Sequence, residues 1–208
     1  MFSIILNIRL VMSLSFIVSI QGGMACGKTT LGKYIESNLK DVKVSYENPG
    51  PVIKEIKRLG LDKYKLKDYI EIQRLFINAE IERYNRLKSF DKVIIDLGPE
   101  EIEFYTLYFP KSIDKDWNIE ELLKDELHRL RQCKLDGILY LDASKEVLRK
   151  RKEGDQNRSR NFFDHYINNL HTYKKQWFSK YDYTTFINVD NMSIDKLGAF
   201  TTKWLEEI

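Results

Sequence analysis

Cysteine is scarce in this chain, which carries thiols at Cys26 and Cys133 alone. Two thiols cannot build the disulfide framework of a small secreted protein, and a chain of 208 residues can bury a sizeable core without one. The three histidines, His128, His165 and His171, show no spacing with cysteines or carboxylates that specifies a metal site. The scarcity of cysteine indicates a reducing, cytoplasmic setting.

Neither sign of charge dominates, because 34 basic residues stand against 31 acidic ones and leave a formal net charge of +3. The two signs are mixed along the chain and form no basic tail, so a nucleic-acid partner is not expected. Low-complexity tracts, internal repeats and linkers are also absent. With 43% hydrophobic residues, the chain is expected to form one globular domain.

An apolar run long enough to suggest a signal peptide covers residues 1–20. Three observations oppose a signal peptide: no positive charge precedes the run, Arg9 interrupts it, and no small-residue cleavage site follows it. We therefore expect no association with a membrane. Met12 stands just before the first predicted strand, so residues 1–11 are interpreted as an upstream extension and residues 12–208 as a single domain.

Short apolar segments alternate with amphipathic helical patterns, which predicts an α/β fold with a buried parallel sheet. The predicted strands cover residues 16–20, 42–46, 92–96, 137–141 and 184–189. Helical stripes lie between and after them, at residues 31–39, 69–87, 117–133, 163–177 and, after Ser193, 194–204.

The most specific motif is a full match to the Gly-x-x-x-x-Gly-Lys-Ser/Thr pattern of a phosphate-binding loop. Its glycines allow backbone amides to face phosphate oxygens, and the helix that follows presents its positive N-terminus. Lys28 is expected to reach the β- and γ-phosphates of ATP, and Thr29 to supply a hydroxyl group to Mg²⁺. The predicted nucleotide-binding residues are Gly22, Gly23, Met24, Ala25, Cys26, Gly27, Lys28, Thr29 and Thr30.

Small-molecule kinases fit this chain better than other classes of P-loop protein. A GTPase needs a guanine-reading Asn-Lys-x-Asp tetrapeptide, which does not occur, and the chain is short for a motor ATPase. The order of features from residue 16 onward resembles the deoxynucleoside kinase and nucleoside monophosphate kinase group. This resemblance implies a doubly wound, five-stranded parallel sheet of order 2-3-1-4-5, with helices on both faces and an acceptor in the cleft above the strand ends.

Two carboxylates follow predicted strands at places where such kinases use acids. Glu47 comes after the second strand, and a carboxylate there can accept the proton of an acceptor hydroxyl group. A solvated loop glutamate is the alternative. Asp96 ends the third strand, where an acid assists Mg²⁺; a helix-cap or turn role is the alternative. In the resembling kinases an arginine follows this acid, whereas Leu97 follows it here. The sequence therefore does not determine how the acceptor is held.

Two further side chains are candidates for binding the acceptor. Gln73 lies on the apolar face of the helical stripe at residues 69–87, where a nucleobase edge would satisfy its amide, and it resembles the base-reading glutamine of deoxynucleoside kinases. A glutamine bonded to neighbouring backbone is the alternative. Arg83, further along the same stripe, is a candidate for binding acceptor oxygens; an ordinary exposed arginine is the alternative.

The segment at residues 149–160 is basic and follows the fourth strand, the place of a lid in small-molecule kinases. Arginines that close over a transferring phosphoryl group stabilise its spreading negative charge. We assign that role to Arg151, Arg158 and Arg160; an ordinary solvated helix end is the alternative.

Together these features predict an ATP-dependent kinase that moves the γ-phosphoryl group of ATP, with Mg²⁺, to a small acceptor. The hydroxyl group of a nucleoside or deoxynucleoside is the first choice of acceptor. A nucleoside monophosphate kinase, another small-molecule kinase and an ATP-binding regulatory protein are the alternatives. Related folds often dimerise through helices beside the acceptor site, so a homodimer is compatible with the resemblance.

Overall fold

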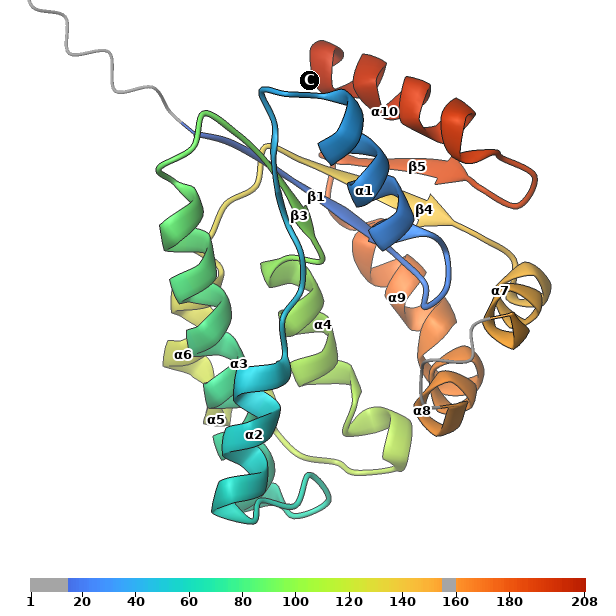
Figure 1. Cartoon of the computed structure of the whole chain (residues 1–208). Helices are drawn as coiled ribbons and strands as arrows, with labels where there is room; N and C mark the ends of the chain where they lie inside the picture. Colours follow the sequence, from blue (N-terminus) through green and yellow to red (C-terminus); the bar gives the residue numbers. More distant parts are fainter. Residues whose placement is uncertain (1–14, 155–159) are drawn as a thin grey trace, which may run out of the picture.

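The computed structural model describes residues 15–154 and 160–208, and it contains a five-stranded sheet (Figure 1). Every strand pair is parallel, and the strand order is β2-β3-β1-β4-β5, which confirms the predicted order 2-3-1-4-5. The strands are β1 (Phe16–Gly22), β2 (Lys43–Ser45), β3 (Lys92–Asp96), β4 (Gly137–Asp142) and β5 (Thr184–Asn188).

Helices cover both faces of the sheet, as Figure 1 shows. Successive residues of a strand point to opposite faces, so Ile17 packs with Tyr84 and Phe178 on one side, while Val18 packs with Leu31 and Trp204 on the other. The helices are α1 (Lys28–Asn38), α2 (Gly50–Leu59), α3 (Leu66–Leu87), α4 (Pro99–Tyr108), α5 (Ile119–Leu122), α6 (Lys124–Leu130), α7 (Lys145–Glu153), α8 (Arg160–His165), α9 (His171–Phe178) and α10 (Ile194–Glu207).

Some helices differ from the sequence expectation. The stripe at residues 117–133 forms two helices, α5 and α6, because Leu123 leaves helical geometry with φ −121° and ψ 24°. The stripe at residues 163–177 runs through α8, a π-helical segment (Tyr166–Leu170) and α9. Helices α2 and α4 were not predicted; each has a proline in its first turn, a position where proline favours helix initiation.

Some sequence expectations lie outside the described residues. The proposed extension at residues 1–11 does, and so does Arg158 in the proposed lid. Among residues 15–154 and 160–208, no helix is both long and apolar enough to cross a membrane.

Candidate active site

The glycine-rich segment forms a tight loop between β1 and α1, and its geometry explains its glycines. Gly22 and Gly27 have φ values of +138° and +107°, a region that residues with a Cβ atom rarely adopt. A Cβ atom on Gly22 would also lie 2.5 Å from the backbone oxygen of Leu141. The loop therefore opens onto the N-terminus of α1 with the backbone geometry of an anion-binding site.

Lys28 begins α1 and lies folded over this loop. Its Nζ donates a hydrogen bond to the backbone oxygen of Gly23 over 2.8 Å and lies 3.4 Å from that of Gly22. Burial alone lowers the pKa of Lys28, but the nearby acidic groups outweigh burial and raise the pKa above its ordinary value. Lys28 is therefore charged at neutral pH and stands where phosphate oxygens would approach the loop amides.

Thr29 and Asp96 meet at the same end of the sheet. The hydroxyl group of Thr29 donates a hydrogen bond to Oδ2 of Asp96 over 3.0 Å. Asp96 pairs with Ile20 in the β1–β3 register, which sets its carboxylate beside the loop that follows β1. Hydroxyl and carboxylate oxygens are ligands that Mg²⁺ prefers, so this pair fits that ion. Within the described ranges there is no cluster of three or more His, Cys, Asp or Glu side chains able to hold a metal by themselves.

Glu47 lies in the loop between β2 and α2, at the rim of a cavity of about 690 Å³. Its side chain is exposed to the cavity, yet surrounding protein removes enough water to raise its pKa, and the negative charge of Glu101 raises it further. Lys28 and Arg83 act in the opposite direction. A carboxylate with a raised pKa at the mouth of a cavity has the properties of a general base.

The cavity joins the two halves of the predicted site. Its volume is in the range of ligand pockets, and its wall combines phosphate-loop residues with an apolar end formed by α3 and α4. The predicted site residues that line it are Met24, Ala25, Gly27, Lys28, Thr29, Thr30, Glu47, Gln73, Asp96 and Arg151. Gly22, Gly23, Cys26 and Arg83 are outside this lining set.

Gln73 stands at the apolar end of the cavity, among aromatic and aliphatic side chains of α3 and α4. Its Oε1 accepts a hydrogen bond from the hydroxyl group of Thr106 over 2.8 Å. Thr106 is fully buried, and the same hydroxyl group lies 2.7 Å from the backbone oxygen of Ile102. The Gln73 amide is thus anchored at one atom, and its other polar atom is available to a ligand.

Arg83 takes a position behind the cavity wall. Its guanidinium donates to the backbone oxygens of Ser45 and Asp96, over 2.7 and 3.1 Å, and to the carboxylate of Glu80 over 3.1 Å. Arg83 therefore ties the end of β2 to the end of β3. Its predicted contact with the acceptor stays a prediction.

The lid arginines are placed only in part. Arg151, on α7, lines the cavity and donates to the backbone oxygens of Cys26 and Val189 over 3.1 and 2.6 Å, so it ties the phosphate loop to the residue that follows β5. Arg160 begins α8, but its side chain is not described, and Arg158 is outside the described residues.

A buried pair at the floor of the cavity was missed from the sequence. Lys174, on α9, contacts both carboxylate oxygens of Glu101, on α4, at 2.5 and 2.6 Å. The sequence held one local sign of this burial: Lys174 follows Leu170 by four residues and so shares the inward face of the helical stripe at residues 163–177. Its partner belongs to a helix that was not predicted.

A phosphate loop after the central strand of a β2-β3-β1-β4-β5 sheet, opening on an acceptor-sized cavity, defines the class of P-loop small-molecule kinases. Within that class, the family model for deoxynucleoside kinase matches residues 18–203. The chain therefore belongs to the deoxynucleoside kinase family, which confirms the resemblance stated above.

Individual relatives are more distant. A deoxyguanosine kinase of Lactobacillus johnsonii is 27% identical over 143 residues. The match covers 62% of this chain and 62% of that enzyme, so the chain spans less than two thirds of the relative's length. A solved structure of deoxyadenosine kinase from M. mycoides, with dCMP and a flexible dCDP bound, has a TM-score of 0.72, with 16% identity, and covers 93% of this chain and 100% of its own. The same enzyme with dATP bound has a TM-score of 0.67, with 16% identity, and covers 92% and 100%. At this identity the structures show a shared fold.

Proposed function

We propose that this protein transfers the γ-phosphoryl group of ATP to a hydroxyl group of a deoxynucleoside. The observation that carries the proposal is the single cavity that holds Lys28 and Asp96 at one end and Gln73 at the other, with Glu47 at its rim. A phosphate site, a base and an amide suited to a nucleobase thus share one cavity. Membership of the deoxynucleoside kinase family supports this reading of the geometry.

Each residue has a distinct part in the proposed reaction. Lys28 and the loop amides hold the phosphates of ATP, and Thr29 with Asp96 would hold Mg²⁺. Bound there, the ion would neutralise charge on the phosphate oxygens. Glu47 accepts the proton that the acceptor hydroxyl group loses as its oxygen attacks the γ-phosphorus, and ADP leaves with the bonding electron pair.

A purine deoxynucleoside is the acceptor to test first. The relative from L. johnsonii is named for deoxyguanosine, and the similar structures are named for deoxyadenosine. The apolar end of the cavity also suits a flat base, because aromatic rings of Tyr69, Phe76 and Phe109 line it around Gln73.

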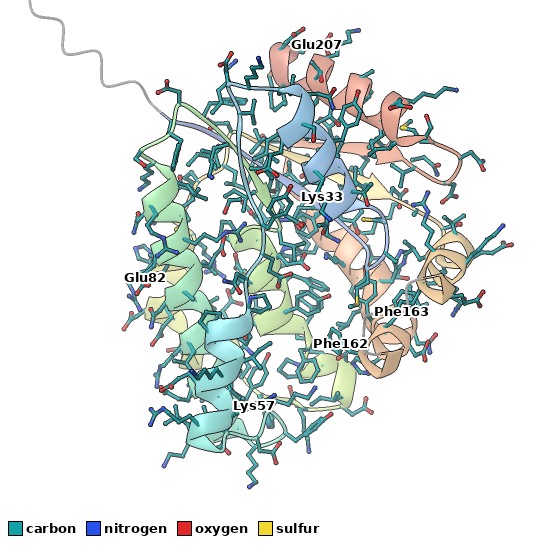
Figure 2. The ribbon with its side chains drawn as sticks, viewed as in Figure 1. Lys33, Lys57, Glu82, Phe162, Phe163 and Glu207 are labelled. Carbon is teal, nitrogen blue, oxygen red and sulfur yellow. The ribbon has the colours of Figure 1, made fainter. Side chains whose placement is uncertain are left out.

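The deciding experiment is an acceptor screen that measures ADP release with Mg²⁺ and ATP. Stimulation by deoxynucleosides supports the proposal; stimulation by monophosphates alone, or by none of the acceptors, contradicts it. Lys28→Ala must abolish the stimulated rate. Lys33→Ala is the matched control, because Lys33 lies on the same helix, is exposed and is outside the cavity lining (Figure 2).

We also propose that the protein acts in the cytoplasm and forms a homodimer. Both described cysteines are buried free thiols, which suits a reducing compartment. Light scattering of the purified protein measures its oligomeric state.

A further inference from the structure

Lys174 is the most unusual charged residue of the described structure. Its side chain is 1% exposed, and aromatic rings of Tyr105, Tyr166 and Phe178 lie within 6.0 Å of its Nζ. Burying an ammonium group costs free energy, and an ion pair regains that cost only when its geometry is good. Burial of the Lys174–Glu101 pair is therefore weak evidence for a purely stabilising role. Because both residues line the cavity, a role in ligand binding is the alternative to consider.

The ammonium group of Lys174 lies beside that of Lys28. Its Nζ donates to the backbone oxygen of Gly22 over 2.9 Å, and this oxygen also lies 3.4 Å from Nζ of Lys28. The two nitrogens therefore contact the same backbone oxygen, and the distance between them is at most the sum of these two contact distances. Since Lys28 is the lysine that meets the β- and γ-phosphates, a second cation stands next to the phosphate position.

Glu101 orients this cation. Its carboxylate contacts Lys174 through both oxygens, and the amide of Gln21, in the orientation that satisfies both of its polar atoms, donates to Oε2 over 3.1 Å. The pair has no net charge, but its ammonium end contacts the phosphate loop at Gly22. A phosphate at the loop would meet the positive end of a fixed dipole.

The other described cations of the cavity make different contacts. Arg151 donates to the backbone oxygens of Cys26 and Val189, and Lys63 lies over the rings of Phe109 and Phe162. The residue after Asp96 is Leu97, where the resembling kinases carry arginine. Among the described cations that line the cavity, Lys174 is thus the one that shares a backbone oxygen of the phosphate loop with Lys28.

We propose that Lys174 supplies, from α9, a second positive charge for the γ-phosphoryl group, in place of the arginine missing after Asp96. The role deepens the proposed function and rests on it for the transfer step. The role of Lys174 predicts an affinity for the γ-phosphate, and this affinity can be measured without turnover. A failed test of Lys174 can therefore be distinguished from a failure of the proposed function.

The test compares the affinity for ADP with that for a non-hydrolysable ATP analogue, by calorimetry with Mg²⁺. Lys174→Met should weaken binding of the analogue about tenfold or more and leave ADP binding nearly unchanged, because only the analogue carries a γ-phosphate. Lys28→Met should weaken both. Lys175→Met, the matched control, removes an exposed lysine of the same helix that pairs with Asp142 and should change neither.

Loss of Lys174 leaves Glu101 buried without its cation, so the double variant Lys174→Met/Glu101→Gln is measured beside it. It removes both charges and is expected to keep a cooperative thermal transition while still losing the γ-phosphate preference. Equal weakening of ADP and analogue, or no weakening of either, in this folded double variant would overturn the proposal. An inactive wild-type enzyme in the acceptor screen would instead count against the proposed function.

Discussion

The hydroxyl group of Thr29 and the carboxylate of Asp96 are joined by a 3.0 Å hydrogen bond, although 67 residues separate them in the chain. Parallel pairing of β1 with β3 creates this contact, because it aligns the two strand ends at one edge of the sheet. Oxygen ligands from two elements, with phosphates and water completing the shell, are the usual protein contribution to a Mg²⁺ site.

Asp96→Asn is therefore expected to raise the Mg²⁺ concentration needed for half-maximal transfer by about tenfold or more, because a neutral amide attracts the ion less. Titration of activity with Mg²⁺ at saturating ATP measures the effect. Asp195→Asn, an exposed change in the first turn of α10, is the control and should leave the Mg²⁺ curve unchanged. An identical curve for Asp96→Asn would remove Asp96 from the metal site.

Glu47→Gln is expected to lower the transfer rate by about a hundredfold or more, the usual contribution of a general base, while ATP binding is retained. The raised pKa of Glu47 also predicts a pH effect. A base must be deprotonated, so wild-type activity should fall as pH decreases through a value above the ordinary glutamate pKa. That acidic limb should disappear in the variant.

The control for this experiment is Glu82→Gln, which changes an exposed residue on the outer side of α3 (Figure 2). It should leave both the rate and the pH profile intact. Normal transfer by Glu47→Gln would show that another group, or none, takes the proton.

Thr106→Val is expected to weaken acceptor binding, because it keeps the side-chain shape but removes the donor that anchors Oε1 of Gln73. A lost hydrogen bond of this kind corresponds to roughly a fivefold rise in KM for the deoxynucleoside. The KM for ATP should not change. Thr202→Val is the control: the hydroxyl group of Thr202 also lies near the backbone oxygen four residues earlier, but on α10, away from the cavity. An unaltered acceptor KM would contradict the anchoring role.

The phosphate loop and the sheet were predictable because their signals are local. The motif from Gly22 to Thr29 dictates its own backbone geometry, and apolar segments such as residues 92–96 have few alternatives to a buried strand. Knowing the order of the strands then places Asp96 beside the loop, as the structure bears out.

The missed features depend on contacts between distant segments. The sequence 99–108 carries three glutamates in an otherwise apolar region, so its helical face was not evident until α3, α6 and α9 were seen to cover it. Lys174 and Glu101 lie 73 residues apart, and neither implies the other without the fold. Both side chains are buried, whereas charged residues are mostly exposed in folded proteins.

Glu100, at the start of α4, should make stability depend on pH. It is buried, its Oε2 has no hydrogen-bond partner among the described atoms, and burial followed by the charges of Glu80 and Glu103 raises its pKa from 4.5 to about 8. Between these two values the folded protein binds a proton that the unfolded chain releases, so the free energy of unfolding falls as pH rises through this range and levels off above it.

Glu100→Gln removes this titration and keeps a side chain of similar shape, so it should flatten the decline and stabilise the protein at alkaline pH. At about 1.4 kcal/mol per pKa unit, the gain above about pH 8 is expected to reach a few kcal/mol at most. Urea unfolding at about pH 6 and about pH 9 measures it. Glu121→Gln, which changes an exposed residue, serves as the control. If wild type and Glu100→Gln lose equal stability between the two pH values, another group causes the decline.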